Sequence, residues 1–213
     1  GARVVVAARS ADTLAALVGR IEAAGGTALA VPADMTDEAQ VEALFATCAA
    51  RFGAPRLVVN NAGIADHTPT VDLSLDRWRA VIDANLTSVF LGARAAMRAM
   101  IAAGGGRIIN VGSISAKVPR FDTAAYAASK FGLEGLTHSL ALDGRAHGIA
   151  VSMVHPGSTV SSLVPGVTDQ PRPGTMAAAD VARVVVLMAS LPDDVNLYEG
   201  TILPITMPFL GRG

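Results

Sequence analysis

A tyrosine and a lysine at helical spacing are the residues here whose combination most clearly suggests chemistry. Tyr126 and Lys130 stand four positions apart, so a helix would project both side chains from one face. A free phenol, with a pKa of about 10, is a poor acid or base at neutral pH, and a neighbouring ammonium would bring that pKa down. The chain has only two tyrosines, and its only lysines are Lys117 and Lys130, so chance rarely produces this pair. The plain alternative is a buried tyrosine beside a surface lysine.

Two further polar residues could serve the same reaction. Ser113 follows an apolar run and precedes Tyr126 in the chain, and its hydroxyl could donate to a carbonyl oxygen that gains negative charge. Asn85 falls inside a long helical pattern, where asparagine is a poor interior residue because its side chain competes for backbone groups. Holding a water against a bent helix would explain it. The alternatives are a loop serine and a tolerated asparagine on a helix face.

The elements that would position these residues alternate between strand-like runs and helical patterns. We expect strands at Arg3–Ala8, Thr27–Val31, Leu57–Val59, Arg107–Val111, Ile149–Val154 and Gly200–Leu203. We expect helices from Ser10 or Asp12 to Ala24, and at Asp37–Phe52, Ser74–Ala103, Thr123–His147 and Ala177–Ser190. Such alternation predicts βαβ units in a parallel sheet covered by helices on both faces, with ligands bound beyond the carboxyl ends of the strands.

The front of the sequence differs from what a dinucleotide-binding sheet normally shows. Such a sheet opens with a strand, a glycine-rich turn and a helix that holds the pyrophosphate. This chain begins at Gly1 with what looks like the second strand, and Gly104–Gly106 precedes a strand instead of following one. We therefore expect that roughly 20–30 residues, the first βα unit, are missing at the front and that two strands lack a neighbour.

Composition narrows the class of protein. A length of 213 residues with 51% hydrophobic and 16% charged residues fits one domain with a sizeable core. The net charge of −1 gives no reason to expect nucleic acid or an anionic membrane as partner. No apolar run is long enough for a membrane span, no signal peptide is visible, and the single Cys48 is compatible with a cytoplasmic location. No metal site is expected, because no histidine pairs with a cysteine or carboxylate at ligand spacing: His67, His138, His147 and His155.

An ordered set of motifs makes a family resemblance visible. The motifs are Asn60-Asn61-Ala62-Gly63 after a strand, Asn85, Ser113, the Tyr126/Lys130 pair, and His155-Pro156-Gly157. In this order the sequence resembles the short-chain dehydrogenase/reductase family over essentially its whole length, with only the glycine-rich front lacking. The resemblance implies a Rossmann-like, doubly wound parallel sheet in three layers, forming one α/β domain over residues 1–213 without its first βα unit.

The resemblance also implies catalytic roles. Tyr126 would be the general acid in carbonyl reduction and the base in alcohol oxidation. Lys130 would lower the pKa of that tyrosine and bind the nicotinamide ribose. Ser113 would orient the carbonyl, and Asn85 would hold a water that links Lys130 to solvent.

Further residues would bind the cofactor by the same resemblance. An arginine after the second strand pairs with a 2′-phosphate, whereas an aspartate accepts hydrogen bonds from the ribose. This chain has Ala8 where NAD-preferring members have aspartate, and Arg9 with Ser10 follows, so NADP(H) is favoured over NAD(H). An exposed loop arginine is the alternative. The other implied contacts are Asp34, Asn61, Ala62 and Gly63 on the adenosine side, and Pro156, Gly157 and Ser161 towards the nicotinamide.

The expected function is an oxidoreductase that interconverts a small ketone or aldehyde and an alcohol, as a homodimer or homotetramer paired through its two long helices. A catalytically silent dinucleotide-sensing or interaction protein is the alternative. An epimerase or dehydratase is a third possibility, although those relatives generally need a larger substrate domain after Pro156. The loop Ser158–Gly174 should cover a fairly apolar substrate. Arg120 and Arg172 could reach a carboxylate, but exposed arginines usually serve no such purpose.

Overall fold

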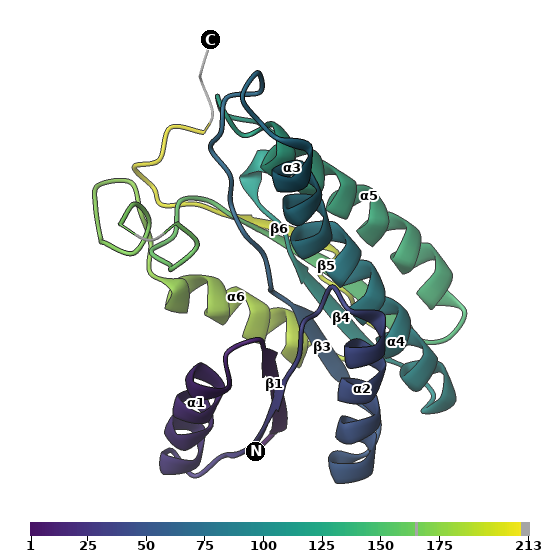
Figure 1. Cartoon of the computed structure of the whole chain (residues 1–213). Helices are drawn as coiled ribbons and strands as arrows, with labels where there is room; N and C mark the ends of the chain where they lie inside the picture. The colour runs from purple at the N-terminus through teal and green to yellow at the C-terminus, as the bar shows by residue number, and fades with distance from the viewer. Residues whose placement is uncertain (165, 210–213) are drawn as a thin grey trace.

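The computed structural model describes residues 1–164 and 166–209. In this part of the chain, strands alternate with helices, and the α/β class expected from the sequence is confirmed (Figure 1). The strands are β1 (Arg3–Ala8), β2 (Thr27–Pro32), β3 (Leu57–Asn60), β4 (Gly106–Val111), β5 (Ile149–Pro156) and β6 (Glu199–Ile202). The helices are α1 (Ala11–Ala23), α2 (Glu38–Phe52), α3 (Leu75–Ile82), α4 (Ser88–Ala102), α5 (Ala124–Arg145) and α6 (Ala178–Ser190).

Side-chain caps explain where three of these helices begin. The side-chain oxygens of Ser10, Asp37 and Ser74 accept hydrogen bonds from the first free backbone N–H groups of α1, α2 and α3. Such caps stabilise a helix start by about 1 kcal/mol each, since those N–H groups have no partner within the helix. The cap at Ser10 also places the end of β1 directly before a helix N-terminus.

The long helix expected over Ser74–Ala103 is interrupted. A π-helical turn, Asp83–Thr87, separates α3 from α4, so the expectation of one continuous α-helix is wrong. Asn85 lies inside this turn and is fully buried. A π turn fits one extra residue into the helix, widens it locally and is found frequently at functional sites. The poor helix propensity of asparagine thus marked a real departure from α-helical geometry.

The strands form two parallel sheets, one of β1 and β2 and one in the order β3-β4-β5-β6. In the larger sheet Asn60 lies opposite Asn110, and Val111 opposite Val154, so the carboxyl ends of neighbouring strands meet at one edge. We expected a single sheet. Within the described residues, β1 and β3 each pair on one side only. A further strand, followed by a glycine-rich turn, that would pair with the free sides of β1 and β3 stays a prediction.

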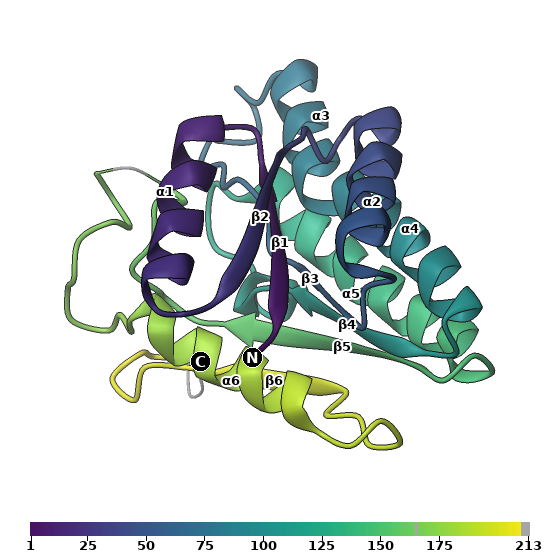
Figure 2. The same ribbon diagram turned by 90° about the horizontal axis from the view of Figure 1, so that it is seen from below.

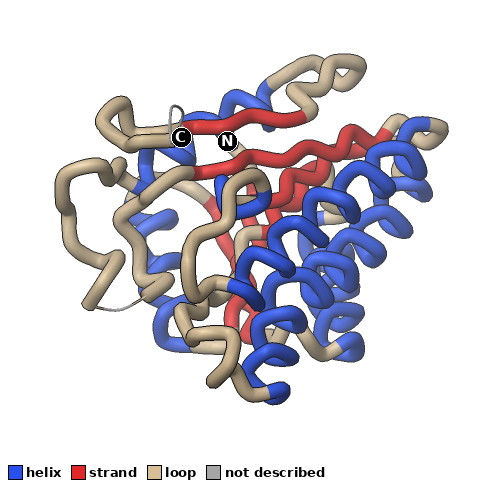
Figure 3. Tube along the Cα trace, turned by 90° about the horizontal axis from the view of Figure 1, so that it is seen from above, coloured by secondary structure: helices blue, strands red, loops and turns tan. Residues whose placement is uncertain are grey.

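Helices cover both faces of the larger sheet, with α3, α4 and α5 on one side and α6 on the other (Figures 1 and 2). Alternate residues of β4 and β5 point to opposite faces. Ile108 and Val151 pack in a cluster with α4 and α5, whereas Ile109 and Val154 pack with Met188 of α6. Long connections, including the one after β5, gather beyond one end of the strands (Figure 3). No helix in the described ranges is long and apolar enough to cross a membrane.

Candidate active site

Helix α5 brings Tyr126 and Lys130 together as their spacing predicts. Lys130 is 5% exposed, and its Nζ lies 5.8 Å from the centre of the Tyr126 ring. The same Nζ donates to the backbone oxygen of Val111, at the end of β4, over 3.0 Å. The pair therefore sits where the carboxyl ends of the central strands meet α5.

Burial controls the ionisation of both side chains. It raises the pKa of Tyr126, and a hydrogen bond with Ser113 and the charge of Arg120 act in the opposite direction. Burial also lowers the pKa of Lys130 to about 8. That Lys130 lowers the pKa of Tyr126 stays a prediction; its Nζ lies 5.8 Å from the centre of the ring and donates to the Val111 carbonyl.

Burial of the Lys130 ammonium should make the folding stability depend on pH. Below pH 8 Lys130 is protonated in the folded and unfolded chains, and the folded chain pays the full desolvation cost of the charge. Between about pH 8 and 10.5 the unfolded chain holds the proton and the folded chain releases it, so stability rises with pH. We expect Lys130→Met to stabilise the protein by about 1–2 kcal/mol at pH 7, after allowing for the lost hydrogen bond.

Urea unfolding of the parent and Lys130→Met at several pH values tests this prediction. The extra stability of the variant over the parent should shrink as the pH approaches 10.5. Lys117→Met is the matched control. Two carboxylate partners, Glu134 and Glu199, raise the pKa of Lys117, so this variant should lose stability at pH 7. A Lys130→Met variant that is less stable than the parent at pH 7 would contradict the prediction.

Ser113 lies next to this pair and is nearly buried. It caps a short 3-10 turn, Ile114–Ala116, in which its Oγ accepts a hydrogen bond from the backbone N–H of Ser115 over 3.0 Å. That bond uses an oxygen lone pair and leaves the hydroxyl proton available for donation. The backbone oxygen of Ser113 lies 2.9 Å from Nδ1 of the fully buried His155, which fixes the turn against β5.

Asn85 holds the connection after β3 against α5. Its Oδ1 accepts from the backbone N–H of Ile64 over 2.7 Å, and its Nδ2 donates to the Ile64 oxygen and to Ser129 Oγ, both over 2.9 Å. A Cβ on Gly63 would lie 2.9 Å from Asn85 Oδ1, so only glycine permits this close approach. One acceptor position of the amide remains for the water expected there, and that role stays a prediction.

Ser129 and Asn110 are site-supporting residues that the sequence analysis missed. Ser129 Oγ accepts from Asn85 and donates to the Tyr126 backbone oxygen, which links the π turn to the first turn of α5. Asn110 of β4 accepts from Asn60 and donates to Thr137 of α5, in both cases over 2.9 Å. Polar residues inside an apolar strand or helix are the signal that could have found them, because burial obliges them to find partners.

The residues expected at the adenosine end lie after β1 and β2. Ser10 uses its oxygen to cap α1, and Arg9 is exposed. Asp34 accepts two hydrogen bonds from Thr36, which lower the pKa of its carboxyl most, and the charge of Arg9 lowers it further. Arg9 is therefore near enough for its charge to act on Asp34, and a shared contact of the two with a cofactor stays a prediction.

The remaining expected contacts lie in the connections after β3 and β5. Asn61 and Ala62 are exposed after β3. The backbone N–H of Gly157 donates to Ile202, and a Cβ there would lie 2.8 Å from the Leu203 side chain and 2.9 Å from Met207 Sδ, so both side chains pack closely on this glycine. Pro156 ends β5. Ser161 Oγ caps the turn at Leu163 over 3.3 Å, and no contact in the described ranges joins it to Tyr126.

Free donors in the site fit a nicotinamide dinucleotide. An ammonium carries three N–H donors, and Lys130 uses one of them on Val111 while buried beside Gly63. Two donors in that position suit the hydroxyl oxygens of a ribose. Exposed Arg9, at the end of β1, suits a phosphate, because a guanidinium can bind two of its oxygens at once.

The expectation that no histidine pairs with a carboxylate at ligand spacing is wrong at a second polar cluster. Ligand atoms of Glu134, His138 and Glu199 lie within 4.8 Å of one another. Glu134 and His138 are also four positions apart on α5, a spacing that the sequence analysis overlooked. Lys117 Nζ lies 2.5 Å from Glu134 and 2.7 Å from Glu199. Its ammonium supplies the positive charge between the two carboxylates and ties the segment after the 3-10 turn to α5 and β6.

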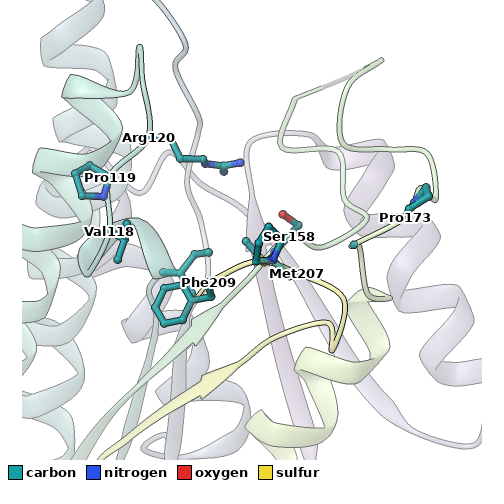
Figure 4. Close-up of a pocket in the computed structure, with 10 residues that line it drawn as sticks. Val118, Pro119, Arg120, Ser158, Pro173, Met207 and Phe209 are labelled. Carbon is teal, nitrogen blue, oxygen red and sulfur yellow. The ribbon is translucent and has the colours of Figure 1, made fainter. Parts of the chain in front are cut away.

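A cavity of about 210 Å³ opens beside the catalytic candidates. Ile114, which follows Ser113, lines it. So does Ser158, which follows Gly157 (Figure 4). The carboxyl-terminal segment that contains Met207 and Phe209 also lines it. The cavity thus lies beyond the carboxyl ends of the strands, where ligands bind in sheets of this type.

Comparisons with known proteins agree with this geometry. The family model described as short chain dehydrogenase matches residues 1–172. A trans-4-hydroxycyclohexanecarboxylate dehydrogenase from Sinomonas cyclohexanicum is 42% identical over 148 residues, which cover 67% of this chain and 57% of that protein. The matched part of the chain therefore spans less than two thirds of the length of that relative.

Solved structures are similar over nearly the whole chain. A metagenomic short-chain oxidoreductase in complex with NADP has a TM-score of 0.81 and 36% identity, covering 96% of this chain and 87% of that one. A gluconate 5-dehydrogenase from Burkholderia cenocepacia, in complex with NADP and tartrate, has a TM-score of 0.87 and 30% identity, covering 95% and 84%.

Proposed function

Because the chain belongs to the short-chain dehydrogenase family, we propose that it interconverts a small ketone or aldehyde and the corresponding alcohol, with NADP(H) and with Tyr126 as general acid and base. The observation that carries this proposal is the pairing of half-buried Tyr126 with buried Lys130, placed beside Ser113 at the end of the central strands. Titratable groups whose pKa values are shifted by burial beside a cavity are typical of catalytic sites.

In the proposed reaction the bound nicotinamide supplies the hydride in reduction and accepts it in oxidation. The Tyr126 hydroxyl gives its proton to the carbonyl oxygen as that oxygen gains charge, and the phenolate takes the proton back in the reverse direction. The Ser113 hydroxyl donates a hydrogen bond to the same oxygen. Lys130 stabilises the phenolate and binds the nicotinamide ribose, and Asn85 keeps the Gly63 connection close to Lys130.

The proposed preference for NADP(H) rests on Arg9. The two NADP complexes named above are similar to this chain, and Arg9 is an exposed guanidinium beside Asp34. We expect Arg9→Gln to weaken NADPH binding about 10- to 100-fold, the range of a charge-assisted hydrogen bond, and to leave NADH binding unchanged. Fluorescence titration with each cofactor measures this. Arg20→Gln, which removes an exposed arginine of α1, is the control. Retained NADPH preference in Arg9→Gln would count against the assignment.

An assay with a panel of ketones and aldehydes, following NADPH and NADH absorbance in parallel, tests the function itself. Turnover with any carbonyl supports the proposal. Tight NADPH binding without turnover of the panel would instead favour the catalytically silent sensor. The cytoplasm is the compartment we propose, since the one cysteine, Cys48, is a free thiol.

We further propose a homodimer or homotetramer that pairs through the long helices. Large apolar side chains are exposed on α4 and α5: Phe90, Ile101, Phe131 and Leu142. Monomeric proteins seldom expose many such side chains together, and a second copy would cover them.

A further inference from the structure

The cavity beside Ser113 is mostly apolar, and its described lining holds a single charged side chain. Among the described residues that line it, most are apolar, one is a serine, and Arg120 is the only charged one. The lining residues are Ile114, Val118, Pro119, Arg120, Ser158, Pro173, Gly174, Met207, Pro208 and Phe209. A volume of about 210 Å³ lies below the roughly 300–1,000 Å³ of pockets for drug-sized ligands, so the cavity suits a small molecule.

Arg120 extends into this space. In Figure 4 its side chain leaves the Val118–Pro119 segment and points across the opening towards Ser158. Seven other basic residues form ion pairs with Asp or Glu in the described ranges, and Arg120 has no carboxylate partner among those residues. Its charge is also close enough to Tyr126 to lower the pKa of the phenol. The guanidinium thus lies at the cavity, near Tyr126 and open to solvent, with its donors unused by the described residues.

The chemistry of this arrangement selects a carboxylate. A guanidinium presents two parallel N–H groups that match the two oxygens of a carboxylate, and an apolar wall strengthens the attraction by excluding water. A phosphate would call for more than one cationic group, and the described lining offers only Arg120. A fully neutral substrate would leave the one charged group of the cavity unused.

We propose that the substrate is a small oxo- or hydroxycarboxylate with an apolar body, whose carboxylate pairs with Arg120 while its carbonyl or hydroxyl carbon faces Tyr126 and Ser113. This inference rests on the proposed function, because it assigns the non-reacting end of the same substrate. The hydrocarbon body would lie against Ile114, Val118 and Phe209. Arg120 is a binding residue in this scheme and takes no part in proton transfer.

An isosteric substrate pair tests the assignment. 4-Oxocyclohexanecarboxylate and 4-oxocyclohexanecarboxamide differ in charge and share size and ring, and 4-oxopentanoate with its amide provides a linear pair. At pH 7 and low salt we expect KM to be about 10- to 100-fold lower for each carboxylate, the range of a charge-assisted hydrogen bond. Added salt should raise KM for the carboxylates only.

Variants assign the effect to one side chain. We expect Arg120→Met to raise KM for the carboxylates about 10- to 100-fold, with kcat within about threefold, and to leave KM for the amides unchanged. Arg120→Lys keeps the positive charge but loses the two parallel N–H groups of the guanidinium. Its KM for the carboxylates should therefore lie between those of the parent and of Arg120→Met. Arg172→Met is the matched control, because Arg172 neighbours Pro173 of the lining and does not line the cavity itself.

The outcomes separate the two proposals. If neither pair nor any ketone or aldehyde of the panel is reduced, the proposed function fails, whereas turnover of the panel without turnover of either carboxylate overturns the substrate assignment alone. Equal KM for carboxylate and amide, together with unchanged kinetics in Arg120→Met, would overturn the substrate assignment while leaving the function in place. Loss of carboxylate preference in Arg172→Met, with Arg120→Met unaffected, would also overturn it.

Discussion

Replacing Tyr126 by phenylalanine is expected to lower kcat for ketone reduction by about a thousandfold, within the range that a positioned general acid contributes. The variant removes one oxygen from a half-buried side chain and keeps the ring that Lys130 faces. Because burial raises the pKa of the phenol, Tyr126 is protonated at neutral pH and ready to donate in the direction of reduction. Oxidation requires the phenolate, so its rate should increase with pH.

Steady-state kinetics and NADPH titration on the same preparation measure this effect. NADPH should bind Tyr126→Phe within a few-fold of the parent, since Lys130 and Arg9 are untouched. Tyr198→Phe is the control, because Tyr198 is the other tyrosine and stacks on His138, 5.5 Å between ring centres, at the second polar cluster. Full turnover in Tyr126→Phe would reject the acid–base role.

Replacing Asn85 by leucine is expected to cost about 2–4 kcal/mol of folding stability. The side chain is 0% exposed and makes three hydrogen bonds, two of them to the backbone of Ile64. Leucine has a similar shape but leaves the Ile64 N–H and C=O without these partners, and an unsatisfied buried group costs about 1–3 kcal/mol. The connection that contains Gly63 would also no longer be fixed beside Lys130. Because we propose that this connection and Lys130 bind the cofactor, NADPH binding should weaken as well.

Urea unfolding with a fixed m value measures the change in stability. Ser139→Ala is a suitable control, since Ser139 is an exposed residue of α5 whose hydroxyl bonds only to Gly135, and it should change stability by less than about 0.5 kcal/mol. A loss below about 0.5 kcal/mol in Asn85→Leu would show that the hydrogen bonds to Ile64 and Ser129 do not hold this part of the site together.

Several features of the site could be read from the chain because they are local. Four residues of helix suffice to place Tyr126 beside Lys130, and the order of apolar runs and caps suffices to predict the α/β arrangement. Even the irregular turn at Asn85 left a local trace, a poor helix former inside a helical pattern. These properties depend on neighbours within one or two turns, so they survive without knowledge of the fold.

Other features depend on which segments meet in space. From the sequence, Arg120 and Arg172 were equal candidates for binding a carboxylate. Only the tertiary structure places Arg120 at the cavity, together with residues 207–209. Lys117 finds Glu199 across 82 positions of the chain, a partner that no periodicity indicates. Burial, which raises the pKa of Tyr126 and lowers that of Lys130, likewise depends on the whole surrounding core.

The sequence by itself thus determined the element order, the Tyr126–Lys130 face and the family to which these motifs point. The tertiary structure decided which donors remain free, which charges are paired and in which direction each pKa moves. The physical reason is range: helix and strand periodicity act over a few residues, whereas desolvation and charge pairing depend on every group that packs within a few ångströms, however distant in the chain.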